Sequence, residues 1–398
     1  MEAYILDYLN FAIRWLHMIA GIAWIGASLY FVWLDSSLLP PKDQPSKDIG
    51  IGGEVWARHG GGFYRAQKFQ VAPPELPTPL HWFKWEAYTT WLSGFALLVL
   101  MYYVQAEVYL IDKRVMDLTP VAAVSAGLGC LAITWIAYDL MCRSRLGDNE
   151  GLLAAVMFVL LAALAYGLTH MYSGRGAFIH FGAVIGTIMV ANVFFVIIPG
   201  QTEMVKAKVE GRAVDPIHGQ MGKQRSVHNT YFTLPVLFVM VSNHYAGFNN
   251  HKHAWAILMA ISLAGALIRL YSVMSHRGQK RPILWMTGYG ILIGLLIALM
   301  PKAPEPGAAQ QKVNFMQVRQ VIEAKCVGCH AAKPTFAGFA APPKNVLLEN
   351  ADQIKVQAQA IYQQTVVTRA MPIGNLTNIT DGERALLSDW FTQGAKIE

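Results

Sequence analysis

Two cysteines and a histidine near the end of the chain, Cys326-Val-Gly-Cys329-His330, have the types and spacing that attach a haem covalently. The two thiols of such a motif add to the porphyrin, and the histidine that follows binds the iron. The remaining iron ligand is usually a methionine thioether, and Met371 lies 41 residues after His330 in an irregular stretch. We therefore predict one covalent haem c held by these four residues.

A zinc site and a thioredoxin-type redox site are the alternatives for this cysteine pair. Zinc would need two more soft ligands, and residues 313–398 contain no other cysteine or histidine. A thioredoxin-type motif belongs to a βαβ pattern, which is absent here. Helical patterns before the motif and at the C-terminus, the latter starting at a capping box from Thr380 to Glu383, instead indicate a class I cytochrome c domain.

The composition of the whole chain is that of a membrane protein. Of the 398 residues, 54% are hydrophobic and 14% are charged, whereas soluble domains carry about 25% charged residues. This excludes a disordered protein or a coiled coil and argues against an ordinary cytosolic enzyme. The net charge of +7 resides mostly in loops between apolar segments, so we expect no nucleic-acid partner.

Eight segments have the roughly 20 mostly apolar residues that a membrane span needs. They are residues 8–34, 84–106, 119–142, 151–171, 177–199, 229–247, 253–274 and 282–300. We predict an all-α fold: an eight-helix transmembrane bundle over 1–300, a Pro/Ala/Gln linker over 301–312 and the cytochrome c domain over 313–398.

The loops between these segments predict the orientation in the bilayer. Sixteen Lys and Arg residues lie in the first, third, fifth and seventh loops, and four lie in the other three. Basic loops stay in the cytoplasm, so both termini and the cytochrome domain should be periplasmic. Haem attachment takes place on that side of a bacterial membrane, in agreement with this orientation.

The first span carries polar residues at steps of three and four, which places them on one helical stripe. They are Arg14, His17, Gly21, Trp24, Ser28, Phe31 and Asp35. Because charges are costly in lipid, the stripe should face the bundle interior and take part in function. The alternative is that Arg14 snorkels to the surface and Asp35 merely ends the helix.

Histidines gather near the predicted outer face: His17, His170, His180, His244, His251 and His253. Singly, each is best interpreted as an interfacial hydrogen-bonding group; together they indicate a substrate site or an additional b-type haem held by a histidine pair. The inner ends of the spans offer their own candidates, Asp35, Glu86, Asp139, His228, Asn229 and Arg269. The Gly-, aromatic- and Arg-containing loop from Glu54 to Lys68 either approaches a flat anionic ligand or simply turns.

Several motifs in this order resemble the bacterial membrane-bound urate oxidases fused to a cytochrome c, the PuuD-type urate hydroxylases. The resemblance covers nearly the whole chain. It rests on Trp15-Leu-His17-x-x-x-Gly21-x-x-Trp24-x-Gly26, Glu54-Val-Trp, His59-Gly-Gly-Gly-Phe-Tyr64, Ser226-Val-His228-Asn229-Thr-Tyr-Phe-Thr-Leu-Pro235, Ser242-Asn-His-Tyr245 and the cysteine motif.

The resemblance implies an inner-membrane oxidoreductase that converts urate to 5-hydroxyisourate. Electrons would leave through its own haem c to a soluble or membrane cytochrome c or a terminal oxidase of the respiratory chain, without formation of hydrogen peroxide. For the urate site we expect Arg14 to compensate charge, His17 or His180 to act as base or haem ligand, and Trp24 to stack on the purine.

Two questions stay open at the level of sequence. The urate site lies either in the outer half, near the histidines, which we favour slightly, or at the cytoplasmic face. The chain is alternatively a membrane-anchored cytochrome subunit that transfers electrons for a separate dehydrogenase or quinone, or a transporter with a fused redox sensor that uses the intramembrane charges for permeation.

Overall fold

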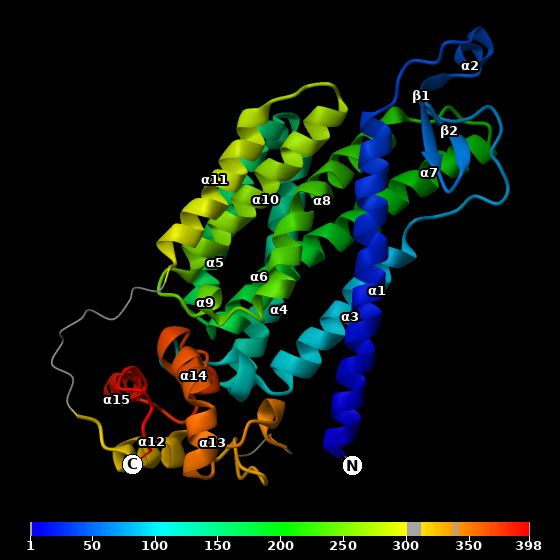
Figure 1. Cartoon of the computed structure of the whole chain (residues 1–398). Coiled ribbons are helices and arrows are strands. Elements are labelled where there is room, and N and C mark those ends of the chain that lie inside the picture. Colours follow the sequence, from blue (N-terminus) through cyan, green and yellow to red (C-terminus); the bar gives the residue numbers. More distant parts are fainter. Residues whose placement is uncertain (1, 301–311, 337–338, 340, 398) are drawn as a thin grey trace.

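The computed structural model describes residues 2–300, 312–336, 339 and 341–397. Most of the predicted linker, residues 301–311, lies outside the described residues. In the described part, long helices pack side by side into a bundle, and a smaller group of helices formed by the C-terminal segment lies at one end of it (Figure 1).

Each of the eight predicted spans is largely helical. The bundle helices are α1 (Glu2–Ser36), α3 (Trp85–Leu98), α4 (Pro120–Arg143), α5 (Glu150–Thr169), α6 (Gly174–Asn192), α7 (Ile198–Val209), α8 (Pro216–Ser242), α10 (Ala254–His276) and α11 (Pro282–Ala298). Five helices of the described chain are long and apolar enough to cross a membrane: Tyr8–Ser36, Pro120–Arg143, Glu150–Thr169, Gly174–Val209 and Ala254–His276. The chain is therefore consistent with a multi-pass membrane protein.

Helix α6 is the centre of the bundle, because it packs against α3, α4, α5 and α8. It continues without a break through the π-helical segment η4 (Val193–Ile197) into α7, so the helix extends about ten residues beyond the predicted span. Segment α3 also passes into π-helical turns, η1 (Val99–Tyr103) and η2 (Ala106–Leu110). Short helices η3 (Arg145–Asp148) and α9 (Ala246–Asn249) connect the spans at opposite ends.

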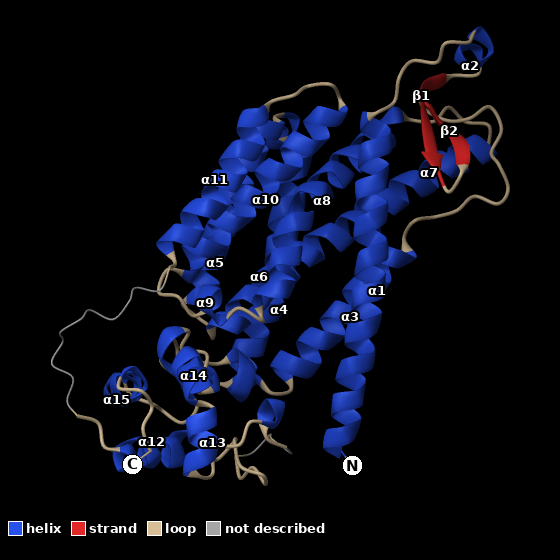
Figure 2. Cartoon of the chain, viewed as in Figure 1, coloured by secondary structure: helices blue, strands red, loops and turns tan. Residues whose placement is uncertain are grey.

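The prediction of an all-α fold is wrong for the first loop. This loop forms a β-hairpin after the short helix α2 (Gln44–Asp48) (Figure 2). Strands β1 (Ile51–His59) and β2 (Gly62–Phe69) pair antiparallel, with His59 opposite Gly62. The turn between them is Gly60-Gly61, whose φ angles of 56° and 83° are those of a two-residue hairpin turn. The glycines of this loop thus allow the chain to reverse, which was one of its two interpretations.

The C-terminal segment has a hydrophobic core of its own, built around Val318, Ile322, Leu387 and Trp390. Its helical elements are α12 (Phe315–Lys325), η5 (Pro343–Asn345), α13 (Ala351–Val356), α14 (Ala358–Ile361), η6 (Tyr362–Val367), η7 (Ile373–Asn375) and α15 (Asp381–Thr392). The predicted capping box is confirmed, since Thr380 and Glu383 each bind the other's backbone N–H. This segment and the first turns of α1 lie at the same end of the bundle, and the hairpin lies at the opposite end (Figure 1).

Candidate functional site

The Cys-x-x-Cys-His motif forms the turn that ends α12. Asn314 caps the start of the helix in a capping box with Gln317, and Cys326 is its C-cap residue. The backbone N–H of His330 then donates to the carbonyl of Cys326 at 3.0 Å. The turn therefore brings both thiols and the imidazole to one end of a single helix.

The His330 ring is fixed by its surroundings. Its Nδ1 lies 3.0 Å from the carbonyl oxygen of Val346, to which it can only donate, and its own carbonyl accepts from the N–H of Leu348 at 2.9 Å. Because Nδ1 then carries the proton, Nε2 is the nitrogen with a free lone pair. This tautomer and orientation are those of a histidine that binds a metal through Nε2.

The loop that carries Met371 is anchored to the same small core by a buried arginine. Arg384 donates to the carbonyl of Met371 at 3.0 Å, to Oδ1 of Asn375 at 3.3 Å and to the carbonyl of Thr365. Burial lowers the pKa of Arg384 to about 10, so its guanidinium still carries a charge at neutral pH. The loop continues to Thr377, whose hydroxyl donates to the carbonyl of Lys325 directly before the motif, at 2.8 Å.

These residues fit a covalently attached haem. Burial raises the pKa of the Cys326 thiol to about 12, so this thiol is protonated at neutral pH. No group of three His, Cys, Asp or Glu residues in the described ranges is arranged to hold a bare metal ion. In a haem c, by contrast, the thiols bond to the porphyrin and only the imidazole and a thioether bind the iron.

The polar stripe of α1 faces the bundle only in part, because Arg14 and Phe31 are exposed while His17, Trp24 and Asp35 are half-buried. Nδ1 of His17 lies 2.9 Å from the Thr90 carbonyl and 3.1 Å from Oγ of Ser93, both on α3. Trp24 packs against the buried Ala87 on the same helix. At the other end of α1, Asp35 forms ion pairs with Lys68 and Lys223.

His180, the other predicted catalytic histidine, is fully buried in a different interface. Its Nδ1 lies 2.8 Å from the Gly176 carbonyl and its Nε2 lies 3.1 Å from the Tyr103 hydroxyl. A Cβ on Gly127 of α4 would lie 2.7 Å from Nε2, so only glycine leaves room for the ring there. His17 contacts α3 and His180 lies between α4 and η1, so the two histidines occupy different interfaces; the additional b-type haem stays a prediction.

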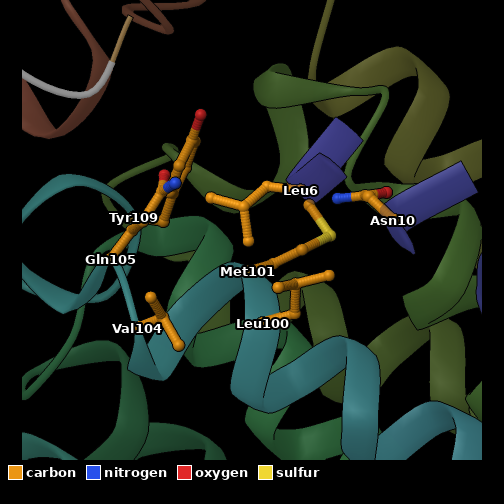
Figure 3. A pocket seen from close by; sticks show the side chains of 7 residues that line it. All are labelled: Leu6, Asn10, Leu100, Met101, Val104, Gln105 and Tyr109. Atoms are coloured by element: carbon orange, nitrogen blue, oxygen red, sulfur yellow. The ribbon is translucent and has the colours of Figure 1, made fainter. Parts of the chain in front are cut away.

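A small cavity lies between α1 and the segment from η1 to η2 (Figure 3), and Arg14 contacts two of the residues that line it. Its guanidinium donates to Oδ1 of Asn10 at 3.1 Å and contacts the sulfur of Met101 at 2.9 Å. Both partners line the cavity, whose volume is about 70 Å³. Ligand pockets usually measure about 300–1,000 Å³, so this cavity is too small for a purine in the described conformation.

The C-terminal segment contacts the bundle at this same end through the loop that follows Met371. Segment η7 packs against η2. Gly374 has a φ of 54°, and a Cβ there would lie 3.4 Å from the Ile111 carbonyl and 3.5 Å from the Val108 carbonyl. Asn250, next to α9, donates to the carbonyl of Thr368 at 3.3 Å. The loop of the predicted iron ligand is therefore the part of the segment that touches the bundle.

A buried polar network lies in the other half of the bundle. The Tyr138 hydroxyl of α4 lies 2.8 Å from Nδ1 of His228 and accepts from the amide of Asn192 at 3.0 Å. Asn192 also donates to Asn229 at 2.9 Å. Nε2 of His228 contacts Glu150 at 3.0 Å, so this imidazole is held between a phenol and a carboxylate and can pass a proton between them.

Arg225 of α8 also belongs to this network. Its side chain is 1% exposed, pairs with Asp139 at 2.8 Å and donates to Asn192 at 3.2 Å. The network includes Asp139, His228 and Asn229, which the sequence marked as inner candidates, and adds Tyr138, Asn192 and Arg225. The i, i+3, i+4 spacing of Arg225, His228 and Asn229 was a usable signal, whereas Asn192 is a single amide in an apolar run.

Buried side-chain atoms without a partner concentrate in the same half. Among the described residues they are Oε2 of Glu86, Nε of Arg225, Oγ1 of Thr230, Oδ1 of Asn249, and Nε and Nη2 of Arg269. All except Asn249 belong to the half of the bundle away from the C-terminal segment. Since buried polar groups are normally hydrogen-bonded, this half has binding capacity that the chain itself does not use.

Comparison with known families gives one match, the family described as urate oxidase N-terminal, over residues 3–300. The matched range covers the whole helical bundle and stops before the segment that contains the cysteine motif. Neither the curated proteins nor the solved structures include a significant match to the chain.

Proposed function

The chain belongs to the urate oxidase N-terminal family, and on this basis we propose that it oxidises urate to 5-hydroxyisourate within the membrane and delivers the electrons to a haem c on its own C-terminal segment. The observation that carries the proposal is the family match over 298 consecutive residues of the bundle, from 3 to 300. The C-terminal segment is outside that match, so its role rests on the geometry of Cys326, Cys329, His330 and Met371.

The reaction balances with water as the only other reactant. Urate and one water give 5-hydroxyisourate, two protons and two electrons, with the new C–O bond formed at C5. Urate is a planar anion at neutral pH, so its site needs a positive group, hydrogen-bond partners in the plane of the ring and a proton acceptor. The bundle offers arginines and histidines for these tasks in both of its halves.

Protons are best accepted by an imidazole whose second nitrogen is held by another group. His17 meets this condition through Thr90, whereas His228 contacts Tyr138 with one nitrogen and Glu150 with the other. His180 already has both nitrogens hydrogen-bonded, which makes it a weaker candidate for base. Arg14 and Trp24, proposed for charge compensation and stacking, share the α1 surface with His17.

Cys326, Cys329, His330 and Met371 would hold a haem c, which would supply one-electron redox chemistry. The chain's own contribution is to hold those ligands: Val346 orients the imidazole, and Arg384 fixes the Met371 loop. The acceptor beyond the chain would be a soluble or membrane cytochrome c or a terminal oxidase.

We further propose the eight-span, inner-membrane topology with a periplasmic C-terminal segment. All eight predicted spans are helical, and α1 begins at the same end of the bundle as the C-terminal segment. The hydrocarbon core is about 30 Å thick, so the depth of the urate site matters. An outer site would lie next to the C-terminal segment, whereas an inner site requires a further electron acceptor inside the bundle.

The decisive experiment is a reduced-minus-oxidised spectrum of the purified full-length protein with and without urate. We expect urate to reduce a c-type haem in the absence of any other protein, and the spectrum also counts b-type haems. An unchanged oxidised spectrum after addition of urate, in protein that dithionite reduces normally, would refute the proposal. It would favour a cytochrome subunit that serves a separate dehydrogenase or quinone.

A further inference from the structure

Arg269 in α10 is a buried cation that forms no ion pair with any residue the structure describes. Its exposed fraction is 8%, and neither Nε nor Nη2 has a hydrogen-bond partner among the described residues. Those two atoms lie on the same edge of the planar guanidinium, the edge that binds a carboxylate or a similar anion with two parallel hydrogen bonds. The free edge therefore has the geometry for a bidentate anion.

A second unpaired group, Thr230, lies on α8 at the level of Arg269. Helices α8 and α10 are connected through the short helix α9 and run antiparallel. They are close at Gly265, where a Cβ would lie 3.0 Å from Cβ of Leu234. One turn further along each helix, Arg269 comes opposite Thr230. The electrostatic interaction between Arg269 and Tyr231 supports this register. Thr230 is fully buried, and its Oγ1 has no partner within the described part of the chain.

The backbone of α8 adds an acceptor at the same level. Pro235 lies inside the helix and has no N–H to donate to the carbonyl of Tyr231, four residues earlier. Two consecutive residues of α8 thus offer a hydroxyl, from Thr230, and a carbonyl without its usual helical donor, from Tyr231. The facing residue of α10, Arg269, offers a cation. This set can satisfy both the charge and the N–H donors of a heterocyclic anion.

The other buried arginines of the chain show that Arg269 is different. Arg225 pairs with Asp139, and Arg384 donates to three oxygen acceptors. A buried charge left unpaired is strongly unfavourable, and inside a bundle an ionisable side chain of this kind marks a ligand site. The missing partner of Arg269 is therefore expected to come from outside the chain.

We propose that Arg269 and Thr230 form the anion-binding part of the substrate site, between α8 and α10, and that they take a planar heterocyclic monoanion. This rests on the proposed function, in which that anion is urate. Arg269 contacts the deprotonated edge of the ring with Nε and Nη2, and Thr230 adds a hydrogen bond. The site lies in the half of the bundle that also contains Asn192 and His228, so electrons from it need a further acceptor inside the bundle to reach the C-terminal segment.

The test compares four variants of the full-length protein in detergent: Arg269→Gln, Arg269→Lys, Thr230→Val and, as a control, Arg281→Gln, which removes an exposed arginine that starts α11. Thermal unfolding is measured without ligand and with urate, phosphate or chloride, and the Kd for urate is derived from the shifts. We expect Arg269→Gln to raise the unfolding temperature of the ligand-free protein, because it removes an unpaired buried charge.

The same substitution that stabilises the ligand-free protein should weaken the binding of urate. Arg269→Gln should weaken urate binding by about tenfold to a hundredfold, the range for loss of a charge-assisted bidentate contact. Thr230→Val should weaken it by roughly threefold to tenfold, and Arg281→Gln should leave it unchanged. Arg269→Lys keeps the charge but loses the fork, so it should weaken binding without destabilising the fold.

Each contrary result has a separate meaning. If wild-type protein oxidises urate but the Arg269 and Thr230 variants bind it with unchanged Kd, the site assignment is wrong and the proposed function stands. A lower stability of ligand-free Arg269→Gln would identify Arg269 as a structural residue and also overturn the site. Equal stabilisation by phosphate and urate would show an inorganic anion site only. If wild-type protein neither binds nor oxidises urate, the proposed function fails and this site fails with it.

Discussion

Two arginines, one buried and one exposed, bind the carboxylate of Asp139. Substituting each of them in turn compares a buried with an exposed ion pair in the same network. Arg225 pairs with Asp139 at 2.8 Å from a side chain that is 1% exposed, and Arg143 pairs with it at 2.6 Å from a side chain that is 49% exposed. Arg225→Gln and Arg143→Gln therefore remove the same charge and the same kind of contact. They differ only in burial and in the further contacts of Arg225.

The magnitudes follow from those differences. Loss of one partner of a buried ion pair costs about 3–5 kcal/mol, and we expect the lower end, about 3 kcal/mol, because Asp139 keeps Arg143 and is 17% exposed. This value includes the lost contact of the guanidinium with the Tyr138 ring, whose centre is 5.0 Å away. An exposed pair contributes about 0–1 kcal/mol, which is the expected cost of Arg143→Gln.

The assay is thermal unfolding in detergent, followed by tryptophan fluorescence. At about 2 °C per kcal/mol for a chain of this size, Arg225→Gln should lower the midpoint by roughly 6 °C and Arg143→Gln by at most roughly 2 °C. Equal shifts for the two variants would refute the reasoning, because burial of Arg225 would then have no energetic consequence. An increase in stability for Arg225→Gln would show that Arg225, like Arg269, is held without adequate partners.

Four further predictions concern the rest of the chain. His330→Ala and Met371→Ala should abolish electron transfer to an external cytochrome and leave urate binding intact; a parallel loss of binding would mean that the C-terminal segment is structural. His17→Ala should eliminate turnover, and near-normal turnover in a steady-state assay would remove α1 from the mechanism. Gly374→Val should weaken docking of the C-terminal segment, because a Cβ there meets two backbone carbonyls and φ is 54°; faster proteolytic release of the segment would confirm this, and an unchanged release rate would contradict it. Hydrogen bonds from Ser46 and an ion pair with Arg65 lower the pKa of the Asp43 carboxyl to about 2. The stability that Asp43 adds to the hairpin region is therefore complete above its usual pKa near 4 and is lost as the pH falls through about 2. Hydrogen exchange of the hairpin amides, corrected for intrinsic rates, should accelerate over that range in wild type but not in Asp43→Asn.

Local sequence signals predicted the helical elements of the bundle and of the C-terminal segment. Apolar runs of about 20 residues predicted the helices of the bundle, because a helix satisfies its backbone within the segment and needs no information from distant residues. The capping box at Thr380 and the spacing of Cys326, Cys329 and His330 are equally local. The capping box is confirmed in the cap of α15, whereas the haem predicted from the cysteine motif stays a prediction.

Pairing between distant residues was decided only by the tertiary structure. The hairpin depends on the register between two strands. In the sequence alone, Gly60-Gly61 is compatible both with a chain reversal and with a loop that binds a ligand. Asn192 and Tyr138 carry no sequence signal, since their importance comes from meeting Arg225 and His228, 33 and 90 residues away along the chain. The same holds for Arg269: its charge is visible in the sequence, but only the packing of α8 against α10 shows that it is buried and that nothing in the described chain pairs with its free edge.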